Sequence, residues 1–497
     1  MPPKKLIIII TYIIKNSLLN ELFLQIIIPA NYREVKKIIN KNLENKNDLS
    51  FKQAIIPVIT MAFFILMSVT FWEVPIQLAL FLEISFTILL ALYWGYRWKE
   101  IEAMLFSSFE SIGNVILILF LIGMMIGIWI GIGTVPTMIF YGLKAINPRF
   151  FFVLSFIITS AVSMAVGTAI GTASTIGLAL ISIAESLGLN MSIAAGSIIS
   201  GCYVGDRMSP VSSIANITAN SAGADLISMI KKMVYTIIPP YLISLLIYFL
   251  IGYLGDYSDL AVDFSQMTSI LHSHFNISVL MITPPILIII LALMQIPTIL
   301  NLMINIFASL FLGIAFTKRS YTELLNIMFS GFNDTTGVEF IDNILARGGL
   351  TSMLELVSLI IFAVILGGIL ENLGILNSLL SKLINNLKTR FHLIAVTMVS
   401  SAISGILGCN QFLAVFLPAR MMIKQYDKAN ISREILGRSL GDSGLILSPL
   451  IPWNVNALMM TAVLGVSTLQ YFRFAFLPLL LPISSLIFAY FQEKTEK

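Results

Sequence analysis

Long apolar stretches recur along most of the chain, and short polar connectors separate them. Five of these stretches reach or approach the roughly 18–20 residues that cross a bilayer as a helix, namely 54–72, 76–93, 112–132, 234–254 and 277–293. Lipid offers no hydrogen-bond partner for backbone amides, so spanning segments should be helices. The pattern predicts an all-α integral membrane protein with roughly 11–13 transmembrane or re-entrant helices.

The polar connectors divide the chain into five parts. These are a basic N-terminal segment 1–52, two leading transmembrane helices in 53–111, a first transport repeat 112–254, connecting helices and a polar loop in 255–353, and a second transport repeat 354–490. Within the first part, the apolar stretch 6–28 could be an interfacial amphipathic helix, an extra span or translated sequence ahead of the true start, and we leave it unassigned.

An internal repeat runs through this layout. A shift of 241 residues places a Ser-Ala-(Val/Ile)-Ser-x-x-x-Gly pattern that begins at Ser160 on another that begins at Ser401. Small residues recur by chance in membrane helices, but a shared offset over some forty residues argues against chance. Further pairs at this offset or a nearby one are Gly127 with Gly368, Arg149 with Arg390, Gly205–Asp206 with Gly441–Asp442, and Ser209–Pro210 with Ser448–Pro449.

Charge predicts that the two copies have opposite orientations. The connector 375–390 carries three basic residues, whereas the matching connector 134–149 carries two. Cytoplasmic connectors are the richer in Lys and Arg, and two leading spans followed by a third already place 134–149 outside. We therefore expect two inverted structural repeats, 112–222 and 355–466, around a site near the membrane midplane.

Composition agrees with a membrane protein and narrows its function. Only 11% of the residues are charged, against about a quarter in soluble domains. The segment 1–52 holds nine Lys or Arg and four Asp or Glu, which predicts a cytoplasmic N-terminus, and no nucleic-acid-binding module accompanies it. Two cysteines and three histidines supply neither a disulfide framework nor a catalytic set. Because no ATP-binding motif appears, we expect a transporter driven by an ion gradient, with no cofactor and no enzymatic activity.

The sharpest candidate site surrounds Asp206. A carboxylate in so apolar a sequence is costly in a membrane and indicates a functional site. Pro210 cannot donate to the carbonyl four residues back, so Asp206 could offer a cation both its carboxylate and a free carbonyl oxygen. Pairing of Asp206 with Arg207 or a nearby lysine at a helix end is the alternative. Na+ prefers oxygen ligands as other hard cations do, and neutral oxygens follow on Ser209, Ser212, Ser213 and Asn216.

A second candidate site contains Asp442. Pro452 frees the carbonyl of Ser448 in the same way, and together with Pro449 it predicts a broken helix whose backbone dipoles could coordinate ions. A kink stabilised by packing is the alternative. Asp206 and Asp442 are thus the candidate Na+ ligands, and the other members of the second set are Ser443, Ser448 and Asn454.

A Gly/Thr-rich stretch at 167–175 is too polar and too flexible for a lipid-facing helix. Polar, irregular backbone is tolerated at membrane depth only inside protein or beside a cavity, so this stretch could form a re-entrant tip that lines the substrate path. Close helix packing through small residues is the alternative. The candidate residues are Thr168, Thr172 and Thr175 in the first copy, and Asn410 and Gln411 in the second.

Four motifs carry a resemblance to a known family. They are Gly127-Ile-Trp129 with the following Gly-Thr-Val-Pro, Gly205–Pro210, Arg347-Gly-Gly, and Ser448–Asn454. With these motifs, roughly residues 50–490 resemble the NhaC-type sodium/proton antiporters, a family that also includes malate/lactate antiporters. The resemblance implies cation/proton exchange across a bacterial plasma membrane, a scaffold domain, a moving transport domain with re-entrant hairpins, and a homodimer.

The chain departs from the family pattern at three positions. Ser213 stands where the family has Asp, Gly441 where it often has Glu, and Asn410 where we expect Asp. Each lost carboxylate removes a negative charge that could offset a bound cation in a low-dielectric site. The departures predict weaker Na+ binding than the full motif gives, or dependence on a co-bound organic anion.

The leading hypothesis is a sodium/proton antiporter that works by alternating access at a midplane site, with the lipid bilayer, Na+ and H+ as its partners. The alternative is Na+- or H+-coupled transport of an organic acid, such as malate or lactate, or of an amino acid. A membrane-embedded enzyme and a passive channel are remote alternatives.

Cysteines at Lys144 and Lys388 test the inverted repeat. A membrane-impermeant thiol reagent added outside should label Lys144→Cys and not Lys388→Cys, because the two connectors are expected on opposite sides of the membrane. The same reagent on everted vesicles should give the reverse pattern. Equal labelling of both cysteines from one face contradicts the inverted arrangement.

Overall fold

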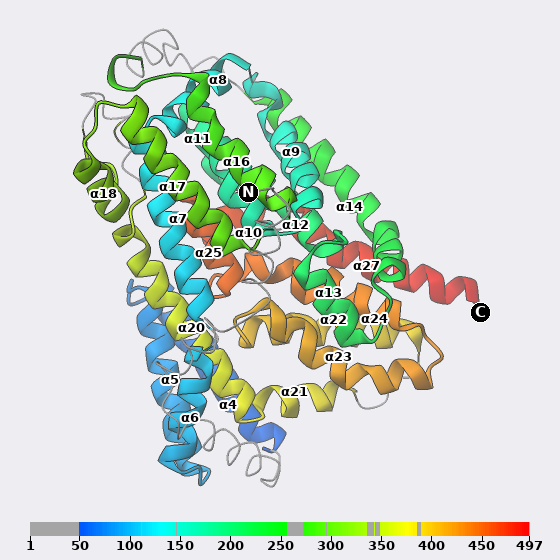
Figure 1. Cartoon of the computed structure of the whole chain (residues 1–497). Coiled ribbons are helices and arrows are strands. Elements are labelled where there is room, and N and C mark those ends of the chain that lie inside the picture. The colour runs from blue at the N-terminus through cyan, green and yellow to red at the C-terminus, as the bar shows by residue number, and fades with distance from the viewer. Residues whose placement is uncertain are drawn as a thin grey trace, which may run out of the picture.

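The computed structural model describes residues 49–110, 112–145, 147–255, 272–294, 296–334, 342, 348–384 and 389–496. Every regular element in these ranges is a helix, which confirms the all-α prediction (Figure 1). Ten helices are long and apolar enough to cross a membrane, or 11 if a bent pair, Arg433–Leu450 and Val455–Leu464, is one span. The stretch 6–28 and the connector residues 385–388 lie outside the described residues.

The described part of the first half forms thirteen helices or helical turns. They are α4 (Phe51–Thr70), α5 (Ile76–Tyr93), α6 (Trp98–Glu110), α7 (Gly113–Gly131), α8 (Thr134–Ala145), α9 (Phe151–Val166), the continuous segment α10–η2–α11 (Ala169–Thr172, Ala173–Gly177, Leu178–Ser186), α12 (Met191–Met208), α13 (Ser213–Ala222) and α14 (Leu226–Leu254), with the turn η1 (Pro148–Phe150) before α9.

The second half repeats this order. Its elements are η3 (Val279–Ile282), α16 (Thr283–Leu293), α17 (Thr298–Phe316), α18 (Tyr321–Ser330), η4 (Thr351–Met353), α20 (Leu354–Asn372), α21 (Ile375–Ile384), α22 (Arg390–Leu407), α23 (Gln411–Lys428), α24 (Arg433–Leu440), η5 (Gly441–Leu445), η6 (Ser448–Leu450), α25 (Val455–Leu464), α26 (Thr468–Tyr471), η7 (Phe472–Phe474) and α27 (Phe476–Glu496).

The helix boundaries of the two halves correspond. Both ends of α7 lie 241 residues before the ends of α20, and α13 begins 242 residues before α25. The correspondence also takes in helices that the sequence pattern left outside the repeats: α5 follows Pro75 and α17 follows Pro297, with nearly the same backbone angles at the two prolines. Within the described residues, the correspondence therefore extends from α5 to α13 in the first half and from α17 to α25 in the second. The opposite orientation of the copies across a membrane stays a prediction.

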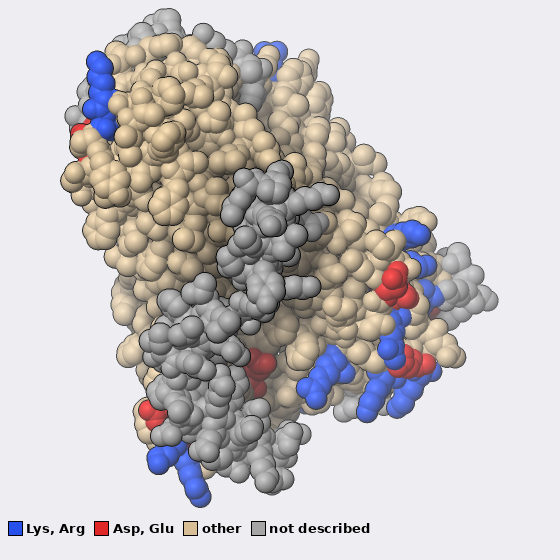
Figure 2. Space-filling model, in the orientation of Figure 1, with Lys and Arg blue, Asp and Glu red and all other residues tan. Residues whose placement is uncertain are grey.

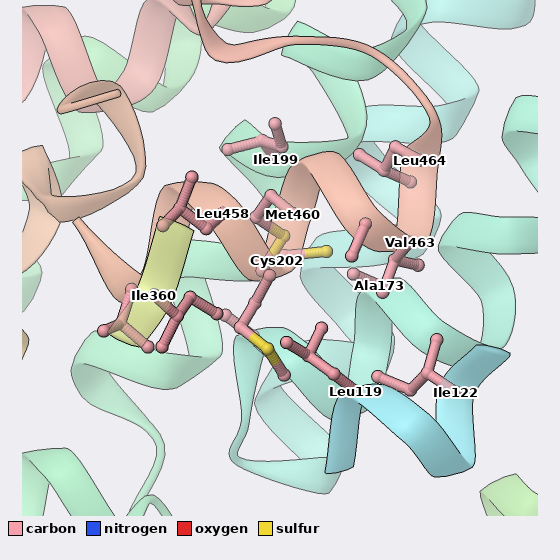
Figure 3. Packing of buried hydrophobic residues seen from close by; sticks show 14 of the residues in the cluster. Leu119, Ile122, Ala173, Ile199, Cys202, Ile360, Leu458, Met460, Val463 and Leu464 are labelled. Atoms are coloured by element: carbon pink, nitrogen blue, oxygen red, sulfur yellow. The ribbon is translucent and has the colours of Figure 1, made fainter. Parts of the chain in front are cut away.

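The leading helices of each half pack against the other half. Helices α5 and α6 pack on α20, whereas α17 and α18 pack on α7 (Figure 1). This arrangement makes the two halves interdependent, because α7 is covered by helices of the second half and α20 by helices of the first half. The central core also contains side chains from both halves of the chain. Figure 3 shows Leu119 and Ile122 of α7 close to Cys202 of α12, Ile360 of α20 and Val463 of α25.

In the first half, α12 lies against α9 through glycine residues. A Cβ on Gly205 of α12 would come within 2.0 Å of the backbone of Ser163 on α9, and one on Gly201 within 2.6 Å of the Phe156 carbonyl oxygen. These contacts pair increasing residue numbers, so α9 and α12 run in the same direction. The segment between them, 169–186, must run back, and its α11 indeed packs on α8, which precedes α9.

The same arrangement occurs in the second half. Ser401 on α22 donates to the Ala414 carbonyl on α23 at 2.7 Å, and Thr397, one turn earlier, lies 3.1 Å from the Tyr426 hydroxyl. Helices α22 and α23 are therefore an antiparallel hairpin. In Figure 1 the first hairpin, formed by α9 and the segment 169–186, lies in the upper part of the molecule, with its α10 near the centre. The second hairpin, formed by α22 and α23, lies in the lower part, and α25 lies between the two.

The surface suits a lipid environment. On the face shown in Figure 2, Lys and Arg gather near the top and along the lower edge, and the surface between them is largely uncharged. Large apolar side chains lie exposed on the outer helices, for example Phe307 and Phe311 of α17, which are 65% and 70% exposed. Apolar side chains facing outward are stable beside lipid and costly in water, which supports a multi-pass membrane protein. Both cysteines are buried and free.

Candidate functional site

Two helix starts meet at the centre of the protein. Helix α9 ends at Gly167, whose φ of 76° is in the left-handed region that favours glycine, and Thr168 then caps the segment 169–186 by accepting from the Gly171 amide. In the second half, Asn410 caps α23 by accepting from the Leu413 amide at 2.8 Å. The chain turns back at both places, and we call these turns, 167–168 and 408–410, the hairpin tips; their re-entrant position in a membrane stays a prediction.

Asp206 lies between the two tips. Its Oδ1 accepts from the Ala169 amide at 3.1 Å, and its Oδ2 accepts from Nε2 of Gln411 at 3.0 Å. Ala169 and Gln411 are the first residues of the two returning helical arms. Helix N-termini carry partial positive charge, so both arms stabilise an ionised carboxylate. Asp206 is 8% exposed, and each of its carboxylate oxygens has one neutral donor.

A chain of amides extends the site into the second half. Oε1 of Gln411 accepts from Nδ2 of Asn456 at 3.0 Å, and that same nitrogen lies 3.2 Å from Oγ of Ser448. The two contacts of Gln411 fix its amide, with the nitrogen toward Asp206 and the oxygen toward Asn456. Asn456 was missed in the sequence because a lone Asn four residues after a Pro-rich break carries no distinctive signal.

The chain break after α12 is closed by its own side chains. The Asp206 carbonyl, which Pro210 was expected to leave free for a cation, instead accepts from the Ser212 hydroxyl. Ser209 donates to the Met164 carbonyl at 2.8 Å, and Asn216 donates to Pro210 and Ser212 carbonyls. Ser213 is exposed at the first turn of α13. Ser212 thus takes up one lone pair of the carbonyl that Pro210 leaves without an amide donor.

Asp442 has a different environment. Its carboxylate forms an ion pair with the guanidinium of Arg207, and Nε of Arg438 lies 3.9 Å away. All three side chains are at most 1% exposed. Arg207 also donates to Thr236 at 3.2 Å. The alternative that Arg207 pairs with Asp206 is therefore not what the structure shows, because Arg207 points to Asp442.

The second break is a broken helix, as the two prolines predicted. The helical segments on either side of it meet at 49°. Asn454 donates to the Gly405 carbonyl at 3.0 Å, and Ser443 to the Met398 carbonyl. A π-helical turn, Gly441–Leu445, precedes the break, and another, Ala173–Gly177, lies within the first returning arm. Such turns often occur at functional sites.

Glycine–serine contacts recur at the two breaks. Gly444 lies against Ser401 as Gly205 lies against Ser163, and in both pairs the glycine amide donates to the serine hydroxyl at 3.1 Å. The two serines are 238 residues apart, whereas the main offset of 241 places Ser401 on Ser160. The surroundings of Asp206 and Asp442 differ, because Asp206 has neutral donors and Asp442 pairs with Arg207.

The threonines of the first arm bond within their own helix. Thr172 donates to the Thr168 carbonyl at 2.9 Å, and Thr175 to the Gly171 carbonyl at 2.8 Å. Each hydroxyl oxygen keeps lone pairs for another partner. Of the sequence candidates, Gln411 and Ser212 hydrogen-bond to Asp206. Ser448 is connected to Gln411 through Asn456.

Comparison with known proteins gives a consistent result. Residues 201–492 match the model of the Na+/H+ antiporter family. The chain is 34% identical to the Na+/H+ antiporter NhaC of Alkalihalophilus pseudofirmus, over 80% of this chain and 86% of that one. It is 32% identical to the malate-2H+/Na+-lactate antiporter of Bacillus subtilis, over 84% and 90%. It is 28% identical to the arginine/ornithine antiporter ArcD of Halobacterium salinarum, over 89% and 92%.

The buried ion pair predicts a large stability effect. Arg207→Ala leaves the buried Asp442 carboxylate with only the longer contact to Arg438 at 3.9 Å, which should destabilise the protein by up to about 3–5 kcal/mol. Arg433→Ala, which removes a half-exposed pair with Asp427, is the matched control and should cost far less, because solvent screens an exposed pair. Thermal unfolding of the purified proteins in one detergent measures both. Equal losses contradict the assigned role of the pair.

Proposed function

The chain belongs to the Na+/H+ antiporter family, and from this membership we propose that it exchanges Na+ for H+ by alternating access, with Asp206 holding either ion. The observation that carries the proposal is the position of the Asp206 carboxylate between the two hairpin tips, bonded to Ala169 and Gln411. One carboxylate at the meeting point of two halves is a site that either half can close from its own side.

Competition for a single carboxylate couples the two ions. Burial disfavours an ionised group, so the empty site is the least stable state, and either a proton or Na+ relieves it. The two ions cannot occupy the same oxygens together, so binding of one releases the other. The two neutral donors keep the carboxylate in place during the exchange, because they bond to it without neutralising it.

Asp442 has a structural role in this proposal. Its charge is already matched by Arg207, so a cation gains little there. The pair instead joins α12, which carries Asp206, to the broken helix of the second half. Asp206 and the amide chain from Gln411 to Ser448 then move as part of one body.

Location and assembly follow from the same membership. We infer a multi-pass protein of a bacterial plasma membrane with a cytoplasmic N-terminus, because the basic excess in 1–52 favours that side. A homodimer, which the resemblance implies, stays a prediction.

A second candidate is coupled transport of a small organic acid or amino acid. The specific observation in its favour is the neutral chain of Gln411, Asn456 and Ser448 beside Asp206. Amides and hydroxyls both donate and accept, so they suit the carboxylate and ammonium groups of such solutes. Proton flux in everted vesicles separates the candidates: Na+ alone should drive exchange under the first, and a solute should be required under the second.

Asp206→Asn tests the exchange site. The variant keeps the shape of the side chain but cannot bind a proton or offset a cation, so Na+-driven proton flux should fall to background. Asp225→Asn is the matched control, because Asp225 is an exposed helix N-cap and Asn caps equally well. Size-exclusion chromatography checks that both variants are folded. Wild-type flux from Asp206→Asn removes this residue from the mechanism.

Ser213→Asp tests the missing carboxylates. A restored acid at the start of α13, next to Ser212, adds negative charge near Asp206, and apparent Na+ affinity should rise roughly tenfold, equivalent to about 1.4 kcal/mol. Ser213→Asn is the neutral control and should leave the affinity unchanged. Half-saturation by Na+ in vesicles without organic anions measures the effect. If the unmodified protein already binds Na+ tightly there, the departures from the family pattern are neutral.

A further inference from the structure

A second buried carboxyl lies on the helix pair α4–α5, outside the two hairpins. Glu83 belongs to the buried face of α5, together with Leu80, Ile84 and Thr87, and is only 1% exposed. Helix α5 packs on α4 and on α20. The proposed exchange makes no use of this residue.

The hydrogen bonds of Glu83 involve only one of its two carboxyl oxygens. Its Oε1 accepts from Thr60 on α4 at 3.1 Å and from Thr87 at 2.9 Å. Its Oε2 is buried and has no hydrogen-bond partner within the described part of the chain. An ionised carboxylate needs donors on both oxygens, because both share the charge. A neutral acid fits better, with Oε1 as the carbonyl oxygen and the proton on Oε2.

Among the described residues, no basic side chain is paired with Glu83. The charged groups of the neighbouring helices are Lys52 on α4, Lys99, Glu100, Glu102 and Glu110 on α6, and Glu355 and Glu371 on α20. Lys52 is about two helical turns from Thr60. The acids would repel a second negative charge and cannot balance it. A bare carboxylate at this position is therefore costly.

We propose that Glu83 is a second proton-binding site, separate from Asp206, and that α4 and α5 pack together with its carboxyl protonated. At alkaline pH the carboxyl gives its proton to water or hydroxide and becomes a carboxylate that faces apolar side chains. The helix pair must then separate enough to admit water or a cation. The hydrogen bond from Thr60 joins Glu83 to α4, so a change in the protonation of Glu83 affects the packing of α4 on α5.

Infrared spectroscopy of the full chain in lipid vesicles detects the proton directly. Exposed acids are ionised above about pH 5, because their pKa values lie near 4, so a carboxylic-acid carbonyl band at neutral pH reports buried acids. In an Asp206→Asn background this band should be present at neutral pH and disappear on alkaline titration. Adding Glu83→Gln should remove the part of the band that this acid contributes, as should Glu83→Met, whereas Glu355→Gln, an exposed acid of α20, should leave the band unchanged. A band that the loss of Glu83 does not reduce, or that is absent when Glu83 is present, overturns the proposal.

Nitroxide labels measure the packing of α4 on α5. Phe64 and Phe86 face each other across the pair, with ring centroids 6.4 Å apart. Labels on cysteines at these positions should move apart between neutral and alkaline pH when residue 83 is Glu, and should keep one spacing when it is Gln. The same pH response in both proteins overturns the proposal. Neither experiment uses ion flux, so its outcome is independent of the exchange mechanism at Asp206.

Discussion

Every interruption of a helix inside a membrane must find its hydrogen-bond partners within the protein, because lipid supplies none. The central part of this protein contains four interruptions, at both hairpin tips and after both Ser-Pro pairs. Side chains close each of them: Thr168 and Asn410 cap the tips, while Ser212 and Asn454 bond to backbone carbonyls at the breaks. The candidate ion site lies at these interruptions, where Asp206 bonds to the first residue of each returning arm.

Close glycine contacts decide where those interruptions lie. Gly205 and Gly444 bring α12 and the second broken helix against α9 and α22 at backbone distance. Any larger side chain would push the helices apart and move Asp206 away from the tip at Ala169. The swapped packing of the leading helices adds a second constraint, because α7 and α20 each depend on the other half of the chain. A relative movement of the hairpins must therefore occur against a frame to which both halves contribute.

Three buried acids show how environment separates chemically similar groups. Asp442 is matched by the full charge of Arg207. Asp206 has only neutral donors. Glu83 has donors on one oxygen alone. These arrangements suit, in order, a permanent ion pair, a carboxylate that exchanges one cation for another, and an acid that keeps its proton. Charge compensation, more than residue type, determines which acid can take part in transport.

The sequence by itself determined the helical fold, because apolar length and period are local properties of the chain. It also determined the repeat and its main offset and the broken helix at Pro449 and Pro452, and it singled out Asp206 as a candidate, because proline and an acid in apolar surroundings act through local chemistry. Only the tertiary structure decided which partner each acid has. Arg207 is adjacent to Asp206 in the chain but pairs with Asp442, 235 residues away, and Asn456 and Glu83 gained significance only from residues on other helices. Such contacts depend on how helices pack against each other, and packing between distant segments leaves no periodic signal in a single sequence.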